Sequence, residues 1–246
     1  MVVVMNPQGK VENPNALHLI RLWGIKAFPF HRNDETRMLD ESNWFGSVMN
    51  IFPVVKTLMD KEEDYIFLFG GRTMEAKEKF DNKLNGIAGD PIMKSANITI
   101  TWYQVGATAK LEAESFWNRV ESMFLLNLNQ EKADLASKQE IQKLLSYKNE
   151  EGWAILSKGP VAMITGRSST FIKVLEEFIN WKDKMGKKKF EEAFKECYSE
   201  IMKTVSHCCR LDIPIVDGKA PERMKCAECE RTMEMFISYK CCSEGG

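Results

Sequence analysis

Apolar and polar positions alternate along the chain in patterns that predict short strands and amphipathic helices in mixed order. Apolar runs of strand length occupy residues 65–69 and 98–105, and a helical pattern at residues 74–84 lies between them. Because a helix that joins two neighbouring strands favours their parallel pairing, this stretch predicts a β-α-β unit. Two further apolar runs, at residues 153–156 and 161–164, flank a Gly-Pro turn and predict an antiparallel pair. The pattern therefore predicts an α/β protein.

The predicted helices show the 3.6-residue period of amphipathic segments, with apolar side chains on one face. Such patterns cover residues 15–23, 41–61, 111–126, 138–145, 171–181 and 189–205. The helix at residues 41–61 is expected to bend near Pro53, because proline removes a helical hydrogen bond. From residue 65 onward the elements follow the order β-α-β-α-β-β-α, which is the connectivity of a thioredoxin-like core. The sequence thus predicts a thioredoxin-like domain at residues 41–184.

Two further units flank this predicted domain. Residues 1–30 combine an apolar run at Met1 to Met5, a turn and one helix. Because a strand, a turn and a helix cannot bury their apolar faces alone, this unit is expected to be the C-terminal remnant of a first thioredoxin-like unit. Residues 187–246 predict a helix followed by a cysteine-rich cap.

Composition and charge exclude some classes of function. The chain has 246 residues, of which 44% are hydrophobic and 28% charged, and its net charge is -1. It therefore lacks the overall positive field of a nucleic-acid-binding protein. Asn6, Gln8 and Lys10 interrupt the apolar N-terminal run, which is too short for a membrane span or a signal peptide. We expect a cytoplasmic protein without a membrane span or a nucleic-acid partner.

The seven cysteines are the strongest chemical signal, because all of them lie in the last fifty residues. Cys226-Ala-Glu-Cys229 has the CxxC spacing that lets two thiolates bind one zinc ion, and further cysteines lie on both sides of it. The best ligand set is Cys209, Cys226, Cys229 and Cys242, with His207, Cys208 and Cys241 as substitutes. Four protein ligands leave no open position for a substrate, so the predicted zinc is structural.

Three alternatives to a structural zinc site remain open. The thiols could be reduced and pack as small hydrophobic groups. Cys226 and Cys229 could instead form a redox pair, although the place of such a pair after the first strand of a thioredoxin core is taken by Gly70-Gly71. A zinc-dependent adaptor for nucleic acid or protein is the third alternative. No phosphate-binding loop, EF-hand or catalytic constellation is recognisable, so the chain is not expected to be an enzyme.

Several stretches resemble one plant family. They are VVVMNPQGKVENPNALHLIRLWGIKAFPF, YIFLFGG, WNRVESM, GWAILSKG and CCRLDIPIVDGKAPERMKCAECERTMEMFISYKCC. Together they are similar to the sieve element occlusion proteins, which include the phloem filament and forisome subunits. The likeness runs from Val2 to Cys242 and is most specific in the cysteine segment. Residues 1–30 are also similar to nucleoredoxin-like sequences.

The resemblance implies a structural phloem protein of sieve elements that forms filaments or plugs and seals sieve plates on wounding. It implies self-association, or assembly with other sieve element occlusion proteins, in the cytoplasm of these cells. A thioredoxin- or nucleoredoxin-like thiol-disulfide oxidoreductase is the alternative. Full-length members have a large N-terminal domain and a longer segment after a strand like residues 98–105, so the resemblance implies a truncated member. Forisome members respond to calcium, but no calcium motif is recognisable here.

Overall fold

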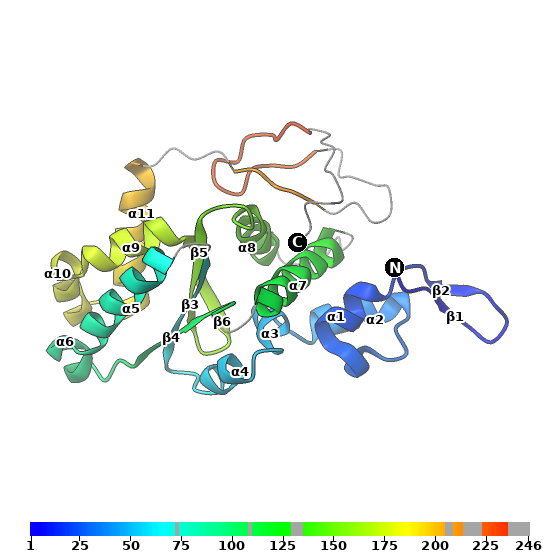
Figure 1. Cartoon of the computed structure of the whole chain (residues 1–246), viewed down its shortest axis with the longest axis horizontal. Coiled ribbons are helices and arrows are strands. Elements are labelled where there is room, and N and C mark those ends of the chain that lie inside the picture. Colours follow the sequence, from blue (N-terminus) through cyan, green and yellow to red (C-terminus); the bar gives the residue numbers. More distant parts are fainter. Residues whose placement is uncertain (72–73, 108–109, 129–134, 205–208, 214–222, 236–246) are drawn as a thin grey trace.

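A computed structural model describes residues 1–71, 74–107, 110–128, 135–204, 209–213 and 223–235. Its centre is a four-stranded sheet with helices on both faces (Figure 1). The strands are β3 (Tyr65–Gly71), β4 (Ile100–Gln104), β5 (Gly152–Lys158) and β6 (Val161–Arg167), in the order β4-β3-β5-β6. β3 pairs with β4 in parallel and with β5 antiparallel, and β5 pairs antiparallel with β6. The parallel and the antiparallel pair predicted from the apolar runs are both confirmed.

Strand β3 is the centre of the core because both of its faces are buried. Successive side chains of a strand point to opposite faces. Phe67 and Phe69 therefore belong to the hydrophobic cluster on one face of the sheet, and Ile66 and Leu68 to the cluster on the other. This double burial explains why the sequence of β3 is a continuous apolar run and not an alternating one.

One face of the sheet is covered by helices from the middle and the end of the chain (Figure 1). They are α5 (Met74–Ala88), α6 (Pro91–Ser95), α9 (Ser168–Glu176), α10 (Phe178–Trp181), the 3-10 helix η2 (Lys182–Gly186) and α11 (Phe190–Thr204). Aromatic rings fill this cluster. Phe69 stacks on Phe80 at a centroid distance of 4.4 Å, and Phe67 meets Phe194 edge-on at 5.6 Å. Such rings bury large apolar areas and hold the helices against the strands.

On the opposite side of the sheet α7 (Lys110–Leu128) and α8 (Leu135–Ser146) form a long helical pair, and the N-terminal helices α1 (Leu17–Trp23) and α2 (Arg32–Asp40) pack beyond α7 at the far end of the molecule (Figure 1). The hydrophobic cluster on this side also includes residues of the 3-10 helix η1 (Gly24–Ala27), α3 (Trp44–Met49) and α4 (Pro53–Met59). Phe116 of α7 stacks on Trp153 of β5 at 4.4 Å. The indole lies so close to β3 that a Cβ on Gly70 would be 2.8 Å from it. Glycine at this position therefore permits the stacked pair.

The predicted helix at residues 41–61 is two helices, α3 and α4, and not one bent helix. Asn43 caps α3 by accepting a hydrogen bond from the N–H of Gly46 at 2.6 Å. Pro53 is the first residue of α4, where its missing N–H costs nothing because that group has no helical partner. The proline thus starts a helix, where the sequence had suggested a bend.

Arg119 of α7 ties the N-terminal helices together. Its guanidinium is buried and donates hydrogen bonds to the carbonyls of Leu22 at 2.6 Å and Val48 at 2.9 Å, and to those of Arg21 and Ser47. These carbonyls belong to α1 and α3, so one side chain joins three helices. Burial lowers the pKa of Arg119 to about 10. Helix α1 therefore packs on the same core as α7. The domain boundaries predicted from the sequence, 1–30, 41–184 and 187–246, stay a prediction.

A second, smaller sheet forms the N-terminal end of the molecule. Strands β1 (Val4–Met5) and β2 (Val11–Asn13) pair antiparallel as a two-stranded ribbon. The side chain of Asn13 donates a hydrogen bond to the carbonyl of Phe30 at 3.1 Å, and the N–H of Ala16 donates to the carbonyl of Val2 at 2.7 Å. The ribbon is therefore attached on both sides of α1 and extends from the end of the molecule away from the central sheet (Figure 1).

The predicted fold class, a thioredoxin-like domain, is wrong, although the C-terminal helix predicted to follow this domain is present as α11. The protein has a mixed α/β arrangement with two separate sheets, of four and of two strands. The order of elements did not decide the fold, because it specifies neither where the N-terminal helices pack nor that the ribbon forms a sheet of its own. Within the described ranges no group of three or more His, Cys, Asp or Glu side chains could hold a metal ion, so the zinc-binding cap is not supported.

Candidate functional site at the cysteine knuckle

The CxxC motif lies in a tight turn that we call the cysteine knuckle, residues 224–233. The N–H of Cys226 donates to the carbonyl of Arg231 at 2.8 Å, and its own carbonyl accepts from the N–H of Glu230 at 2.9 Å. The N–H of Met233 donates to the carbonyl of Met224 at 2.8 Å and closes the turn. Glu230 has a φ of 58°, a left-handed conformation that reverses the chain. The backbone therefore fixes the knuckle locally.

Two thiols meet at the knuckle. The Sγ atoms of Cys209 and Cys226 lie 3.0 Å apart, although 17 residues separate them in sequence. Burial raises the pKa of the Cys226 thiol, but hydrogen bonds to its sulfur from Cys209 and from the N–H groups of Glu228 and Cys229 outweigh burial and lower this pKa to about 7. Burial, together with the adjacent Cys226, raises the pKa of Cys209. The pair can therefore share one proton and one negative charge.

The predicted zinc ligands are only partly brought together. Cys209 and Cys226 are in contact, whereas Cys229 is exposed. Cys242 and the substitutes His207, Cys208 and Cys241 lie outside the described residues. The knuckle that the structure shows is thus a close pair of thiols in a tight turn. Zinc binding by Cys209, Cys226, Cys229 and Cys242 stays a prediction, which elemental analysis of protein purified without chelator would test.

The middle of the CxxC motif anchors the knuckle to the central sheet. Glu228 is buried, with 3% of its side chain exposed, and its carboxylate accepts hydrogen bonds from Arg167 Nη1 at 2.7 and 3.0 Å. The hydroxyl of Tyr147 donates to the same carboxylate at 2.8 Å. Arg167 is the last residue of β6 and Tyr147 directly follows α8. Glu228 therefore joins the knuckle to the central sheet and to the end of α8. We call these three residues the Glu228 anchor.

The electrostatics of the Glu228 anchor favour its charged, paired state. Burial raises the pKa of Tyr147, and the nearby Tyr198 and Glu228 raise it further, so the phenol stays protonated and donates. Burial lowers the pKa of Arg167, but its hydrogen bonds and proximity to Glu228 outweigh burial and raise it. The guanidinium also lies over the Tyr147 ring, 5.1 Å from the centroid, where the aromatic face attracts a cation. The anchor is therefore a paired buried charge with its hydrogen bonds satisfied.

Further contacts hold the rest of the C-terminal segment. The side-chain amide of Gln142 donates to the carbonyl of Lys225 at 2.5 Å, and that of Asn149 donates to Asp212 at 2.5 Å. Leu211, Ile213 and Met224 pack against the hydrophobic cluster that contains α7 and α8. The segment is thus attached by polar and apolar contacts together, above α8 and the end of the sheet (Figure 1).

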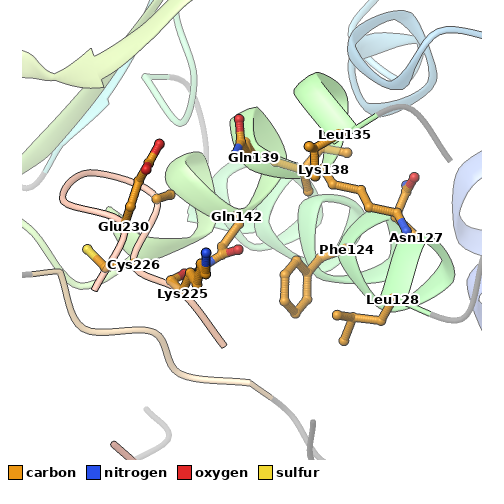
Figure 2. Close-up of a pocket in the computed structure, with 12 residues that line it drawn as sticks. Phe124, Asn127, Leu128, Leu135, Lys138, Gln139, Gln142, Lys225, Cys226 and Glu230 are labelled. Atoms are coloured by element: carbon orange, nitrogen blue, oxygen red, sulfur yellow. The ribbon is translucent and has the colours of Figure 1, made fainter. Parts of the chain in front are cut away.

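A cavity of about 320 Å³ lies between α7, α8 and the knuckle (Figure 2). Phe124 and Leu128 of α7 and Leu135 of α8 form its apolar side, and Cys226 and Glu230 line the knuckle side. The polar groups at the cavity are amides, lysines, one glutamate and the thiol. Its volume is at the lower end of the range for small-molecule pockets.

Sequence reasoning missed the Glu228 anchor. Glu228 was interpreted only as a residue between the two cysteines of the motif. Its partners Arg167 and Tyr147 lie 61 and 81 residues before it in the sequence. A weak signal was available, because Arg167 ends an otherwise apolar strand and an arginine there needs a partner if it is buried. The contact itself joins residues too distant in sequence for periodicity or spacing to find.

Comparison with known proteins gives the family. The family model described as "Sieve element occlusion C-terminus" matches residues 91–243, which include the whole central β-sheet except β3, and the cysteine knuckle. The chain belongs to the sieve element occlusion family. The similarity to this family noted in the sequence is thereby confirmed.

Curated relatives extend the match over nearly the whole chain. Protein SIEVE ELEMENT OCCLUSION B of Arabidopsis thaliana is 29% identical over 99% of this chain and 37% of its own length. Protein SIEVE ELEMENT OCCLUSION A of the same plant is 28% identical over 99% of this chain and 34% of its own length. The chain thus spans little more than a third of these sieve element occlusion proteins.

Two further findings bear on the earlier expectations. No solved structure matches the chain, so no known fold supports the thioredoxin-like assignment or the oxidoreductase alternative that rested on it. In the part of the chain that the structure describes, no helix is both long and apolar enough to cross a membrane.

Proposed function

We propose that the chain is a non-enzymatic structural protein of the phloem, which associates with itself or with other sieve element occlusion proteins and contributes to the sealing of sieve elements. The observation that carries this proposal is the family match over residues 91–243. The names of the relatives, SIEVE ELEMENT OCCLUSION A and B, supply the process in which the chain would act. Formation of filaments or plugs that close sieve plates on wounding is the finer form of the proposal.

The geometry of the knuckle supports a structural role. Reactive cysteines lie in partly exposed sites, whereas the Glu228 carboxylate inside this motif is buried and accepts hydrogen bonds from Arg167 and Tyr147. The thiol of Cys226 is buried against Cys209, with 5% of the residue exposed. The hydrogen bonds of these side chains therefore hold the C-terminal segment against the central sheet and the helices that cover it.

A test in the plant addresses the site of action. The chain, fused to a fluorescent protein and expressed from its own promoter, is expected in sieve elements and is expected to collect at sieve plates after wounding. A fusion carrying Glu228→Ala, which loosens the knuckle, is the matched comparison and should accumulate less. Fluorescence confined to cells outside the phloem, or unchanged by wounding, would contradict the proposal.

An assay in solution tests our proposal that the protein has no thiol-disulfide oxidoreductase activity. A dithiol reductant reduces insulin slowly by itself. Purified protein is expected not to accelerate this reaction, and Cys226→Ser is expected to give the same background rate. Reduction of insulin by the wild type that is lost in Cys226→Ser would show thiol-disulfide exchange and would contradict a purely structural role.

A further inference from the structure

Exposed apolar side chains gather at the N-terminal end of the molecule. They lie on the β1–β2 ribbon and the two residues before it, on α1, on η1 and directly after η1, and we call them the N-terminal apolar patch. Its members are Val2, Val3, Met5, Val11, Ile20, Ile25 and Phe28. Ile25 is 79% exposed and Phe28 64% exposed, which is high for large apolar residues. Because the ribbon is hydrogen-bonded on both sides of α1, the segments that carry these side chains lie together at the N-terminal end of the molecule (Figure 1).

The exposed area of the patch is that of a protein interface. With whole-residue areas of roughly 150–200 Å², the exposed fractions correspond to roughly 650 Å² of surface per chain. Monomeric proteins rarely expose a contiguous apolar area of this size without using it. One partner contributes about 800 Å² to an interface of standard size, so two copies of the patch with their polar rim would supply a stable dimer interface.

The edge of β2 provides a way for two copies to pair. Among the described strands, β2 pairs with β1 alone. The carbonyl of Lys10 accepts a hydrogen bond from the N–H of Asn6 at 2.9 Å and so points toward β1. Since backbone groups alternate in direction along an antiparallel strand, the N–H and C=O of Val11 point to the outer edge. Such an edge is a template for a strand from another chain.

Charge along β2 is self-complementary. Lys10 and Glu12 flank Val11 and carry opposite charges, and the Glu12 carboxylate also accepts a hydrogen bond from the side-chain amide of Asn6 at 3.0 Å. If two copies of β2 pair antiparallel about a two-fold axis at Val11, Lys10 of each copy lies opposite Glu12 of the other. Opposite charges at directly opposed positions stabilise antiparallel pairs. The register of the ribbon shifts by a bulge between its two pairs of residues, which keeps the new ladder short. The apolar side chains would therefore provide most of the contact.

We propose that the N-terminal apolar patch is an assembly interface that takes a second copy of this chain, with the two β2 edges pairing antiparallel about Val11. The proposal rests on the proposed function, because it names the surface through which the chain self-associates. An isologous contact of this kind uses the same patch on both copies and produces a two-fold dimer as the unit of larger assemblies.

Sedimentation equilibrium of the full chain tests the apolar part of the interface. Ile25→Asp and Phe28→Asp each place a charge in the patch, and each is expected to weaken the self-association constant by about tenfold or more. Ile179→Asp is the matched control, because Ile179 lies on α10 away from the patch and is 64% exposed, as Phe28 is. The control is expected to associate as the wild type does. Circular dichroism of each variant shows whether it has folded.

Charge reversal tests the pairing itself with changes at exposed or partly exposed positions. Lys10→Glu and Glu12→Lys each place like charges opposite one another and are expected to weaken association. The double variant Lys10→Glu/Glu12→Lys restores opposite charges and is expected to associate like the wild type. Association restored on mixing the Lys10→Glu chain with the Glu12→Lys chain would show that the two positions meet between copies, because each chain then meets opposite charges only on its partner.

The outcomes separate this inference from the proposed function. A wild-type chain that stays monomeric at every concentration overturns this inference and limits the proposed function to association with other sieve element occlusion proteins. A wild type that associates, with patch and charge variants that associate equally well, overturns the interface and leaves the proposed function standing. A double charge variant that associates no more strongly than the single variants also overturns the interface. The patch would then bind another partner, or the strands would pair in another register.

Discussion

Replacement of Glu228 by alanine is the most informative perturbation of the cysteine knuckle. The change removes a carboxylate that accepts hydrogen bonds from Arg167 at 2.7 and 3.0 Å and from Tyr147 at 2.8 Å. The side chain of Arg167 is 8% exposed, so its charge would stay buried with Glu150, 3.5 Å away, as its remaining carboxylate partner. Breaking a buried ion pair from one side costs about 3–5 kcal/mol. Because Glu150 remains, we expect a loss near the lower end, about 3 kcal/mol.

Urea unfolding followed by tryptophan fluorescence measures this loss. We expect the free energy of unfolding to fall by about 3 kcal/mol for Glu228→Ala, a large fraction of the stability of an ordinary domain. Glu200→Ala is the matched control, because Glu200 pairs with Lys203 on the surface, where their side chains are 71% and 68% exposed. Its cost should stay below about 1 kcal/mol. Equal, small losses for both variants would refute the view that the knuckle is anchored by a buried charge.

A double-mutant cycle isolates the interaction. Arg167→Met removes the other charge, and we expect the double variant Arg167→Met/Glu228→Ala to be more stable than the sum of the two single losses predicts. The reason is that neither charge is then left buried without its partner. Strict additivity of the two losses would show that these residues do not act on one another.

Three further predictions concern other parts of the molecule. Arg119→Met should lower the free energy of unfolding by about 3 kcal/mol in urea, since several buried carbonyls lose their donor; a loss below about 1 kcal/mol would contradict the three-helix contact. Gly70→Ala should lower the melting temperature, because its methyl group would overlap the indole ring beneath it, whereas Gly86→Ala, in open space on α5, should not. The alkylation rate of Cys226 should rise with pH through about 7, because the thiolate forms above this value. In Cys209→Ala the midpoint should move upward, and an unchanged midpoint would show that the neighbouring thiol has no influence.

The strands of the central sheet could be predicted from sequence because their signals are local. Continuous apolar runs bounded by glycine indicated β3 and β5, and their burial on both sides agrees with this pattern. Helix α2 (Arg32–Asp40) was missed, since its residues are polar and its apolar stripe is narrow. Its start depends on a local cap in which the N–H of His31 donates to Asp34 at 2.8 Å. Such a cap can start a helix without any hydrophobic period.

The fold and the site depended on contacts that no local pattern contains. The β-α-β-α-β-β-α order suggested a thioredoxin-like domain, but nothing in that order placed α1 against α7 or set the β1–β2 ribbon apart as its own sheet. The cysteine spacing correctly drew attention to the knuckle. It could not show that Cys226 meets Cys209, or that Glu228 is the residue that joins the knuckle to the sheet. These features follow from tertiary packing over many residues.

Electron microscopy of the purified chain across a dilution series tests the central claim most directly, which is that this protein works by assembling. The account predicts ordered assemblies at high concentration that dissociate on dilution, and their loss in Phe28→Asp but not in Ile179→Asp. Wild-type particles that remain single chains at every concentration would contradict it.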